Sequence, residues 1–231
     1  MTFDFYGISI HEFDVAITDL LLFIESVFFA YFLYKQQSSQ VLLRRLLIFL
    51  FISLSISSLL GALFHAFFPG KVTTIIGFIF WMLVANSIGI TASVVWSINA
   101  LISKGSKFFK TTLPFVAVYM IVFAHTMLFI NYQFKTIILF YAPPMLILAL
   151  VSLLKFFRKH SYAWIGLFIG VTLSFIAATI QYLKISVHPV YFNYNALYHV
   201  IQAISLAIIF LSFRLILKKF PDTENTSQKS Y

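Results

Sequence analysis

The sequence predicts an all-α, polytopic membrane protein built as a bundle of seven transmembrane helices. The 231 residues are 61% hydrophobic and only 10% charged, whereas soluble domains are nearer to one half and one quarter. Seven apolar runs are each long enough, at about 1.5 Å per residue, to cross the roughly 30 Å hydrocarbon core of a bilayer. Because every backbone polar group must be paired within lipid, runs of this length indicate helices rather than barrel strands.

The seven apolar runs follow one another with short connections and leave no room for a second domain. We expect the spans near Val15–Tyr34, Leu46–Phe68, Val72–Ile102, Thr112–Ile130, Thr136–Phe156, Tyr162–Leu183 and Asn195–Leu217. Residues 1–220 would form the transmembrane domain, and residues 221–231 a polar, disordered cytoplasmic tail. Pro114 suits the start of the fourth span. Pro143 and Pro144 remove two backbone donors from the fifth span, where we expect a kink.

The basic residues predict the orientation of the chain. Thirteen of the sixteen Lys and Arg residues flank the first, third and fifth connections and the C-terminal end, and only Lys71, Lys135 and Lys184 flank the alternate connections. The positive-inside rule then places the N-terminus outside and the C-terminus in the cytoplasm. Nucleic acid is not expected as a partner, because the positive charge is spread over short segments and forms no single aromatic-interleaved patch.

Two acidic side chains within the expected membrane region are the first candidates for a functional site. No Asp or Glu lies between Glu25 and Asp222, and only Asp19 and Glu25 fall well inside an expected span. An ionisable group at such a depth is costly unless it is paired or hydrated, so function is the default hypothesis. Asn86 and Ser87 are candidate partners of Glu25, or they join helices by hydrogen bonds.

Histidines from other spans are expected at the depth of Asp19. His65 and His199 lie within roughly 6 Å of the outer boundary, and His125 lies about 8 Å from it. The chain has no cysteine, so a metal would need His and acidic ligands. Two imidazoles and a carboxylate suit zinc with an open position for water, so we expect Asp19, His65 and His199 to bind zinc. Two alternatives stay open, namely packing residues joined by hydrogen bonds and bis-histidine haem.

Further polar residues share helical faces with these histidines. Asn195, His199 and Gln202 have i, i+4, i+7 spacing and form one polar stripe, and Ser58 shares a face with His65. Asn195, Gln202 and Ser58 are therefore candidate catalytic residues, with the two amides as donors to a developing oxyanion. Asn195 equally suits the cap of the seventh helix.

Short motifs in two spans resemble a known superfamily. "AITDLLLF" in the first expected span, "NALYHVIQ" in the seventh and a histidine at the outer end of the second span are similar to the alkaline ceramidases, progestin/adipoQ receptors and hemolysin III relatives, and more narrowly to a bacterial branch of that group. The resemblance implies a seven-span protein of the bacterial inner membrane, zinc as the cofactor, and hydrolysis of a lipid-like amide or ester near the outer face. Membrane lipid and a lipid-like substrate would be its partners.

The chain departs from the ceramidase pattern at three positions. That pattern has a serine four residues before the second-span histidine, where this chain has Gly61, with Ser58 further back. The first histidine of the seventh-span His-x-x-x-His motif is replaced by Asn195, and His199 matches the second. The third-span aspartate has no acidic counterpart. Either Asp19 substitutes as the anionic ligand of a hydrolase, or the metal site is lost and the protein is a non-catalytic one that binds or transports a small lipid or solute.

Overall fold

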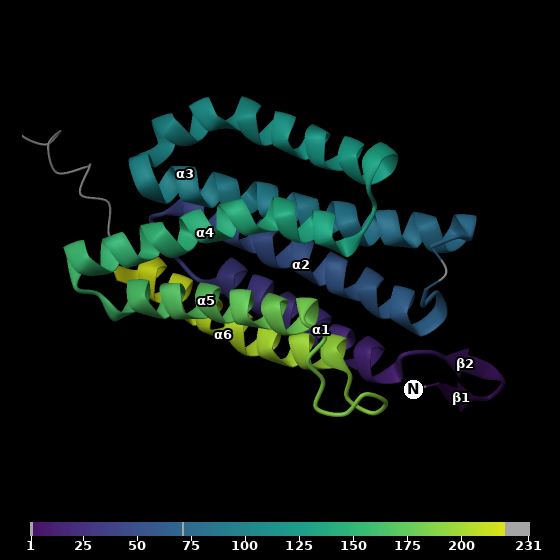
Figure 1. Ribbon diagram of the computed structural model, residues 1–231. Helices are drawn as coiled ribbons and strands as arrows, with labels where there is room; N and C mark the ends of the chain where they lie inside the picture. Colours follow the sequence, from purple (N-terminus) through teal and green to yellow (C-terminus); the bar gives the residue numbers. More distant parts are fainter. Residues whose placement is uncertain (1, 71, 220–231) are drawn as a thin grey trace, which may run out of the picture.

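The computed structural model describes residues 2–70 and 72–219 as a helical bundle preceded by a small β-hairpin (Figure 1). The hairpin pairs β1 (Phe3–Phe5) with β2 (Ile8–Ile10) in antiparallel register. The helices are α1 (Phe13–Lys35), α2 (Val41–Phe67), α3 (Ile75–His125), the π-helical turn η1 (Thr126–Ile130), α4 (Phe134–Lys159), α5 (Tyr162–Tyr182) and α6 (Tyr194–Lys219). The expected tail, residues 221–231, lies outside the described residues.

Six helices within the described ranges have the length and apolar composition needed to cross a membrane. Their outward-facing side chains are large and apolar, such as Ile121 and Leu139, which are 67% and 62% exposed. Such a surface is stable in lipid and unfavourable in water. The chain is therefore an integral, multi-pass, all-helical membrane protein, as its sequence predicts.

Helix α3 covers both the third and the fourth expected spans. As one straight helix its 51 residues would reach roughly 77 Å, more than twice the thickness of the hydrocarbon core. The backbone leaves the helical region at Gly105, where φ is 80° and ψ is −170°, a conformation open essentially to glycine alone. At that residue α3 turns back on itself, and its two arms run side by side (Figure 1).

The expected connection between Ile102 and Thr112 was therefore wrong in its length. The Lys-containing polar stretch there resembles a loop in sequence, but one glycine with positive φ suffices to reverse the chain. The second arm of α3 is already helical before Thr112, so Pro114 lies inside the helix and does not start it. We refer below to residues 75–104 and 106–125 as the first and second arms of α3.

The two arms of α3 pack tightly at Gly89. A β-carbon at Gly89 would collide with the ring of Phe123, which is 1% exposed. Phe123 belongs to a small core between the two arms, η1 and α4, and its buried members are Met82, Ala85, Phe123, Met127 and Ile137. The absence of a side chain at Gly89 therefore sets the distance between the arms.

The two prolines of α4 lie within a continuous helix. Pro144 leaves the carbonyl of Phe140 without its usual helical donor, and the hydroxyl of Tyr119 on the second arm donates to that carbonyl instead. The side chain of Asn99 on the first arm donates to the carbonyl of Pro144 at 2.7 Å. Both arms of α3 are thus attached to α4 at the prolines.

A larger core lies among all six helices. Contacts join each helix to the next along the chain, and α1 also packs against α6, so the bundle closes into a ring. The closure brings the first turns of α1 beside the first turns of α6. It is this contact that allows residues almost the whole chain apart to form a common site.

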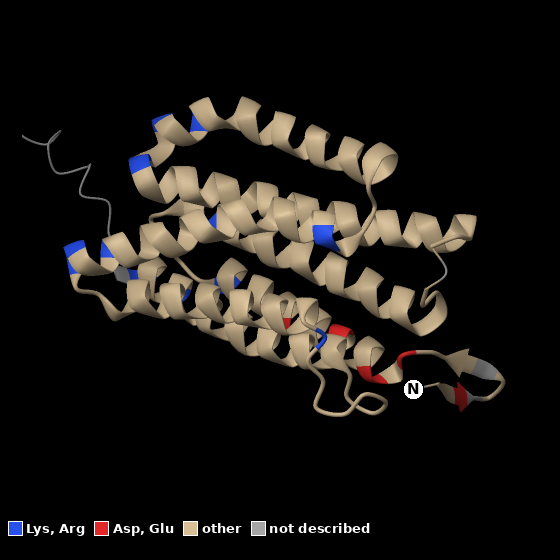
Figure 2. Ribbon diagram, viewed as in Figure 1, with Lys and Arg blue, Asp and Glu red and all other residues tan. Residues whose placement is uncertain are grey.

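Charged residues separate toward the two ends of the bundle (Figure 2). Asp and Glu gather at the end that carries the hairpin and the start of α1, whereas Lys and Arg lie mostly at the opposite end, where α3 bends. The two ends therefore offer different chemistry, and the histidines of α2 and α6 lie at the acidic end.

Candidate functional site

The structure brings His65, His199 and Asp19 together at the acidic end of the bundle. The ring centres of His65 and His199 are 6.3 Å apart, and Nε2 of His199 lies 3.4 Å from Oδ1 of Asp19. His199 and Asp19 are almost fully buried, at 7% and 6% exposure. Three different helices, α2, α6 and α1, supply these side chains.

Gly61 on α2 provides the space for the carboxylate of Asp19. A β-carbon at Gly61 would lie 2.7 Å from Oδ2 of Asp19, far inside the ordinary contact distance between carbon and oxygen. Asp19 can approach α2 this closely only because position 61 has no side chain. One turn further along α2, His65 then lies on the same side of the helix.

Thr18 determines which nitrogen of His199 carries the proton. The hydroxyl of Thr18 lies 2.9 Å from the carbonyls of Asp14 and Val15 and 3.1 Å from Nδ1 of His199, and it has one proton to donate. When that proton goes to a carbonyl, the usual bond of a threonine inside a helix, Oγ1 accepts the Nδ1–H of His199. Nε2 of His199 then carries a lone pair on the side of Asp19.

Glu12 determines the orientation of His65 in the same way. Oε2 of Glu12 lies 2.5 Å from Nδ1 of His65, so the ring donates through Nδ1 and keeps its lone pair on Nε2. Glu12 precedes the first turn of α1 with φ 39° and makes no capping bond to that helix. A non-glycine residue in this conformation is uncommon, and here it directs the carboxylate toward His65 and away from the helix terminus.

The pair of His199 and Asp19 is electrostatically incomplete. A lone pair on Nε2 faces a carboxylate oxygen at 3.4 Å, and both atoms are acceptors unless a proton or a cation lies between them. In a buried site such a repulsion is costly, because no water screens it. The arrangement therefore requires a positively charged partner at this point, either a proton or a metal ion.

Two imidazoles and a carboxylate are suitable ligands for zinc, but these three groups do not surround a single point in the structure. Two ligands of a tetrahedral zinc with bonds near 2.0–2.1 Å are roughly 3.4 Å apart, which matches the separation of His199 and Asp19. The rings of two histidines on one such ion would be roughly 5 Å apart, closer than the 6.3 Å between His65 and His199. In residues 2–70 and 72–219 no three His, Asp or Glu side chains stand close enough as they are to hold a metal ion.

Histidines that bind metal ordinarily donate their other ring nitrogen to an outer partner. A carboxylate, a carbonyl or a water is the usual partner, and it sets the tautomer and orientation of the ring. Glu12 supplies such a partner to His65, and Thr18 supplies one to His199. Both histidines are therefore prepared to offer Nε2 as a ligand.

The three predicted catalytic residues lie apart from the histidine cluster in their hydrogen bonds. Asn195 accepts a bond from Gln181 at 3.0 Å, and Gln202 donates to Ser174 at 3.1 Å, so both join α6 to α5. Ser58 is half-buried on α2. Nothing in these contacts links the three side chains to the histidines.

The expected cap at Asn195 was wrong by two residues. The cap of α6 is Asn193, whose Oδ1 accepts the backbone N–H groups of Asn195 and Ala196 at 2.8 and 3.1 Å. The backbone N–H of Asn193 is in turn bound by Oδ2 of Asp14 at 3.0 Å. A carboxylate at the N-terminus of α6 also suits the positive end of the helix dipole.

Glu25 and His125 lie outside the cluster. Oε2 of Glu25 is buried without a hydrogen-bond partner among the described residues. The expected partners are engaged elsewhere, since Asn86 donates to Met82 and Ser87 donates to Leu83. His125 is exposed near the end of the second arm of α3, with its ring 5.0 Å from that of Phe129.

Sequence reasoning missed Glu12, Thr18 and Asp14 as parts of this region. Glu12 and Asp14 precede the expected first span, and Thr18 has no charge to attract notice. One signal was present in the sequence, because Asp14 lies four residues before Thr18, which places these two residues on one helical face. Their partners on α2 and α6 required the fold.

We expect Thr18→Val to shift the ring proton of His199 from Nδ1 to Nε2. The valine keeps the volume and removes one acceptor of Nδ1–H. The carbonyl of Val15 remains beside the ring, but a bond from Nε2–H to the carboxylate of Asp19 is charge-assisted and stronger, so the proton moves to Nε2. Nitrogen-15 NMR of selectively labelled histidine in the metal-free protein should show the unprotonated-nitrogen signal of His199 change from Nε2 to Nδ1. His65 serves as the internal control, and an unchanged His199 signal would contradict the assigned hydrogen-bond direction.

The fold and this cluster define an integral, multi-pass membrane protein with a buried histidine–carboxylate site. A model of a family of unknown function (DUF6962) matches residues 15–218, and the chain belongs to that family. The matched range includes Asp19, His65 and His199 and begins after Glu12. No curated protein and no solved structure matches the chain.

Proposed function

We propose that the protein is a membrane-embedded, metal-dependent hydrolase of a lipid-like amide or ester, with zinc bound by Asp19, His65 and His199. The observation that carries this proposal is the contact between His199 Nε2 and Asp19 Oδ1. Two acceptors lie 3.4 Å apart in a buried site, at the separation of two ligands of one tetrahedral zinc. The outer hydrogen bonds of both histidines support the same assignment.

Gly61 supports Asp19 as the anionic ligand. In the ceramidase pattern this position is a serine, and the acid comes from the third span. In this chain position 61 is glycine, and the carboxylate of Asp19 fills the adjacent space. The two departures from the pattern thus compensate each other, because the missing side chain on α2 makes room for an acid from α1.

The chain's own residues would position the reacting groups. When bound, a zinc ion supplies the Lewis acidity that activates a carbonyl group and a water for hydrolysis. Glu12 holds the ring of His65 and Thr18 holds that of His199, which fixes both lone pairs toward the ion. Asn195 and Gln202 would have to leave their partners on α5 to reach a substrate, so our proposal gives them a role in helix packing.

We further propose that the two arms of α3 cross the membrane separately. Residues 106–125 would span about 30 Å as a helix, and the chain would then cross seven times. Lys and Arg lie mostly at the end where α3 bends, which the positive-inside rule assigns to the cytoplasm. The N-terminus and the histidine site would face outward from a bacterial inner membrane, with the C-terminus inside.

A second function is favoured by the bonds between α5 and α6. Gln181 to Asn195 and Gln202 to Ser174 join these helices directly, as polar residues do in membrane proteins without catalysis. On this hypothesis the protein binds or transports a small lipid or solute, and the buried pair of His199 and Asp19 shares a proton.

The metal content of the purified protein distinguishes the two functions. We expect about one zinc per chain in the wild type and in the control His125→Ala, whose imidazole is exposed outside the cluster. In His199→Ala the zinc should be lost, and hydrolysis of a fluorogenic N-acyl amide should fall with it. Metal-free wild-type protein, or full zinc retention by His199→Ala, would overturn the hydrolase proposal.

A further inference from the structure

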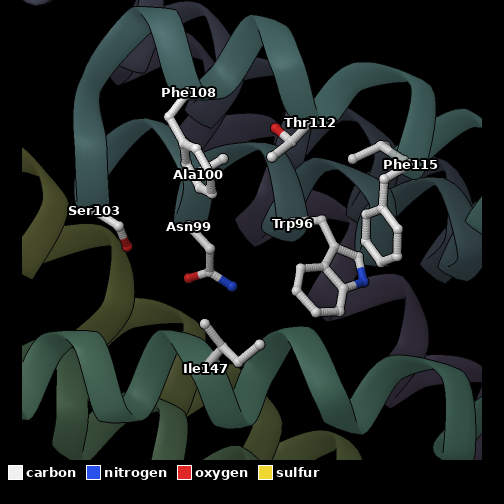
Figure 3. Close-up of a pocket in the computed structure, with 9 residues that line it drawn as sticks. Trp96, Asn99, Ala100, Ser103, Phe108, Thr112, Phe115 and Ile147 are labelled. Carbon is white, nitrogen blue, oxygen red and sulfur yellow. The ribbon is translucent and has the colours of Figure 1, made fainter.

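A cavity of about 310 Å³ lies between the two arms of α3 and α4 (Figure 3). Trp96 and Asn99 of the first arm, Phe108 and Phe115 of the second arm, and Ile147 of α4 contribute to its walls. These residues flank the bend at Gly105, so the cavity lies at the basic end of the bundle, opposite to the histidine cluster. Its volume is within the range of small-molecule sites.

An unpaired buried acceptor lies on the wall of this cavity. Oδ1 of Asn99 has no hydrogen-bond partner among the described residues, and Asn99 is 3% exposed. Nε1 of Trp96 also lacks a close partner, but it is directed at the hydroxyl of Tyr119. Because buried polar groups are nearly always paired, the amide oxygen indicates that something inside the cavity donates to it.

The orientation of the Asn99 amide follows from its neighbour. The NH₂ group donates to the carbonyl of Pro144 at 2.7 Å, and a carbonyl can only accept, so the amide cannot be flipped. The oxygen is therefore the unpaired atom. In Figure 3 the amide lies among the lining side chains with its oxygen on the side of Ser103.

In Figure 3 the amide oxygen of Asn99 and the indole nitrogen of Trp96 lie on opposite sides, the oxygen toward Ser103 and the nitrogen toward Phe115, so one small group cannot bond both. The Asn99 oxygen needs a hydrogen-bond donor inside the cavity. Ser103 and Thr112 also line the cavity, whose other walls are mainly aromatic and aliphatic. A single water could donate to the oxygen but would leave most of the cavity unfilled, so an occupant that fills it must combine one donor group with an apolar body.

We propose that this cavity is a binding site for a membrane-soluble amphipathic molecule with a hydroxyl group. The hydroxyl donates to Oδ1 of Asn99, and a hydrocarbon chain fills the remaining space beside Trp96, Phe108 and Phe115. Phe108 and Phe115 line the cavity and are nevertheless 37% and 50% exposed, so part of the cavity wall is itself exposed to the surroundings of the bundle. The site is independent of the proposed metal.

Fluorescence of Trp96 tests this site directly. With Trp81 and Trp164 replaced by Phe in the full chain, Trp96 is the only tryptophan, and bromine quenches it on contact. We expect 11-bromoundecan-1-ol to quench it saturably. The methyl ether of the same molecule cannot donate to Asn99 and should bind about tenfold more weakly. Calorimetric titration of the unaltered chain with the alcohol should give the same affinity, which removes any dependence on the tryptophan replacements.

Two variants locate the bound probe. Ala100→Phe places a ring in the cavity and should abolish saturable binding. Ala117→Phe, on the exposed side of the second arm, adds the same ring outside the cavity and should leave the binding unchanged. Quenching that rises linearly without saturation, equal affinities for the alcohol and the ether, or saturable binding that survives Ala100→Phe would each overturn the proposal.

Discussion

Asp19→Asn is expected to stabilise the metal-free protein while it weakens zinc binding more than about 100-fold, since loss of an outer partner alone costs 10–100-fold. The asparagine has the shape of the aspartate, so it fits the space beside Gly61, and its NH₂ group can donate to Nε2 of His199. Without zinc, the aspartate must take up a proton from solution to face Nε2 of His199, whereas the asparagine donates its own N–H. At a pH high enough that this proton is not held, relief of the contact between two acceptors is worth about 1–3 kcal/mol.

Thermal unfolding of the purified, zinc-free protein measures the first effect. At about 2–4 °C per kcal/mol for a chain of this size, Tm should rise by roughly 2–12 °C. Competition with a zinc-binding dye measures the second. A rise in Tm together with a fall in zinc affinity would identify Asp19 as a ligand under electrostatic strain. Replacement of an ordinary packing residue would not raise Tm and lower zinc affinity at the same time.

Asp14→Asn is the matched control for Asp19→Asn. Asp14 is a buried acid one turn earlier on α1, and its Oδ2 accepts the backbone N–H of Asn193 at 3.0 Å. Removing its charge takes an anion from the N-terminus of α6, so Tm should fall slightly and zinc affinity should stay within a fewfold of the wild type. A fall in Tm for Asp19→Asn at that pH would show that the carboxylate is not under electrostatic strain, and unchanged zinc affinity would exclude Asp19 as a ligand.

Gly89→Leu is expected to separate the two arms of α3 and to lower the free energy of unfolding by about 3 kcal/mol, the upper end of the usual cost of overpacking. The added side chain would meet the ring of Phe123, which is buried and cannot move outward without opening the small core of Met82, Met127 and Ile137. Denaturation in detergent, followed by circular dichroism, measures the loss.

A second substitution distinguishes this clash from a general intolerance of α3. Phe123→Ala should destabilise the wild type by leaving a cavity, but in the Gly89→Leu background it should restore part of the lost stability, because it removes the ring that the leucine meets. Ala117→Leu, on the exposed side of the second arm, should be nearly neutral. Simple additivity of Gly89→Leu and Phe123→Ala would mean that these two residues do not form the contact between the arms.

Hydropathy and length were enough to predict a helical membrane protein, because lipid leaves the backbone few alternatives. They were not enough to place the reversal between the third and fourth expected spans. The lysines near it suggested a loop of several residues, whereas the turn depends on the backbone angles of Gly105 alone. The backbone conformation of a single residue cannot be recognised from the hydropathy or the composition of the segment around it.

The candidate site was likewise predicted only in part from the sequence. Depth counted along each helix placed Asp19, His65 and His199 in one layer, since a helix rises by a constant distance per residue. Depth carries no information on rotation about each helix axis or on the neighbours of each helix. The roles expected for Asn195 and Gln202 depended on those rotations, and the structure pairs them with Gln181 and Ser174 of α5.

The sequence by itself determined that the chain is a multi-pass helical membrane protein, and which ionisable residues lie near one end of its helices. Only the tertiary structure decided that Glu12 holds His65, that Thr18 holds His199, and that Gly61 admits the carboxylate of Asp19. The physical reason is that burial in lipid acts on every residue of a span and is readable from composition. A hydrogen bond joins two particular atoms, and the packing of α1 against α2 and α6 brings them together.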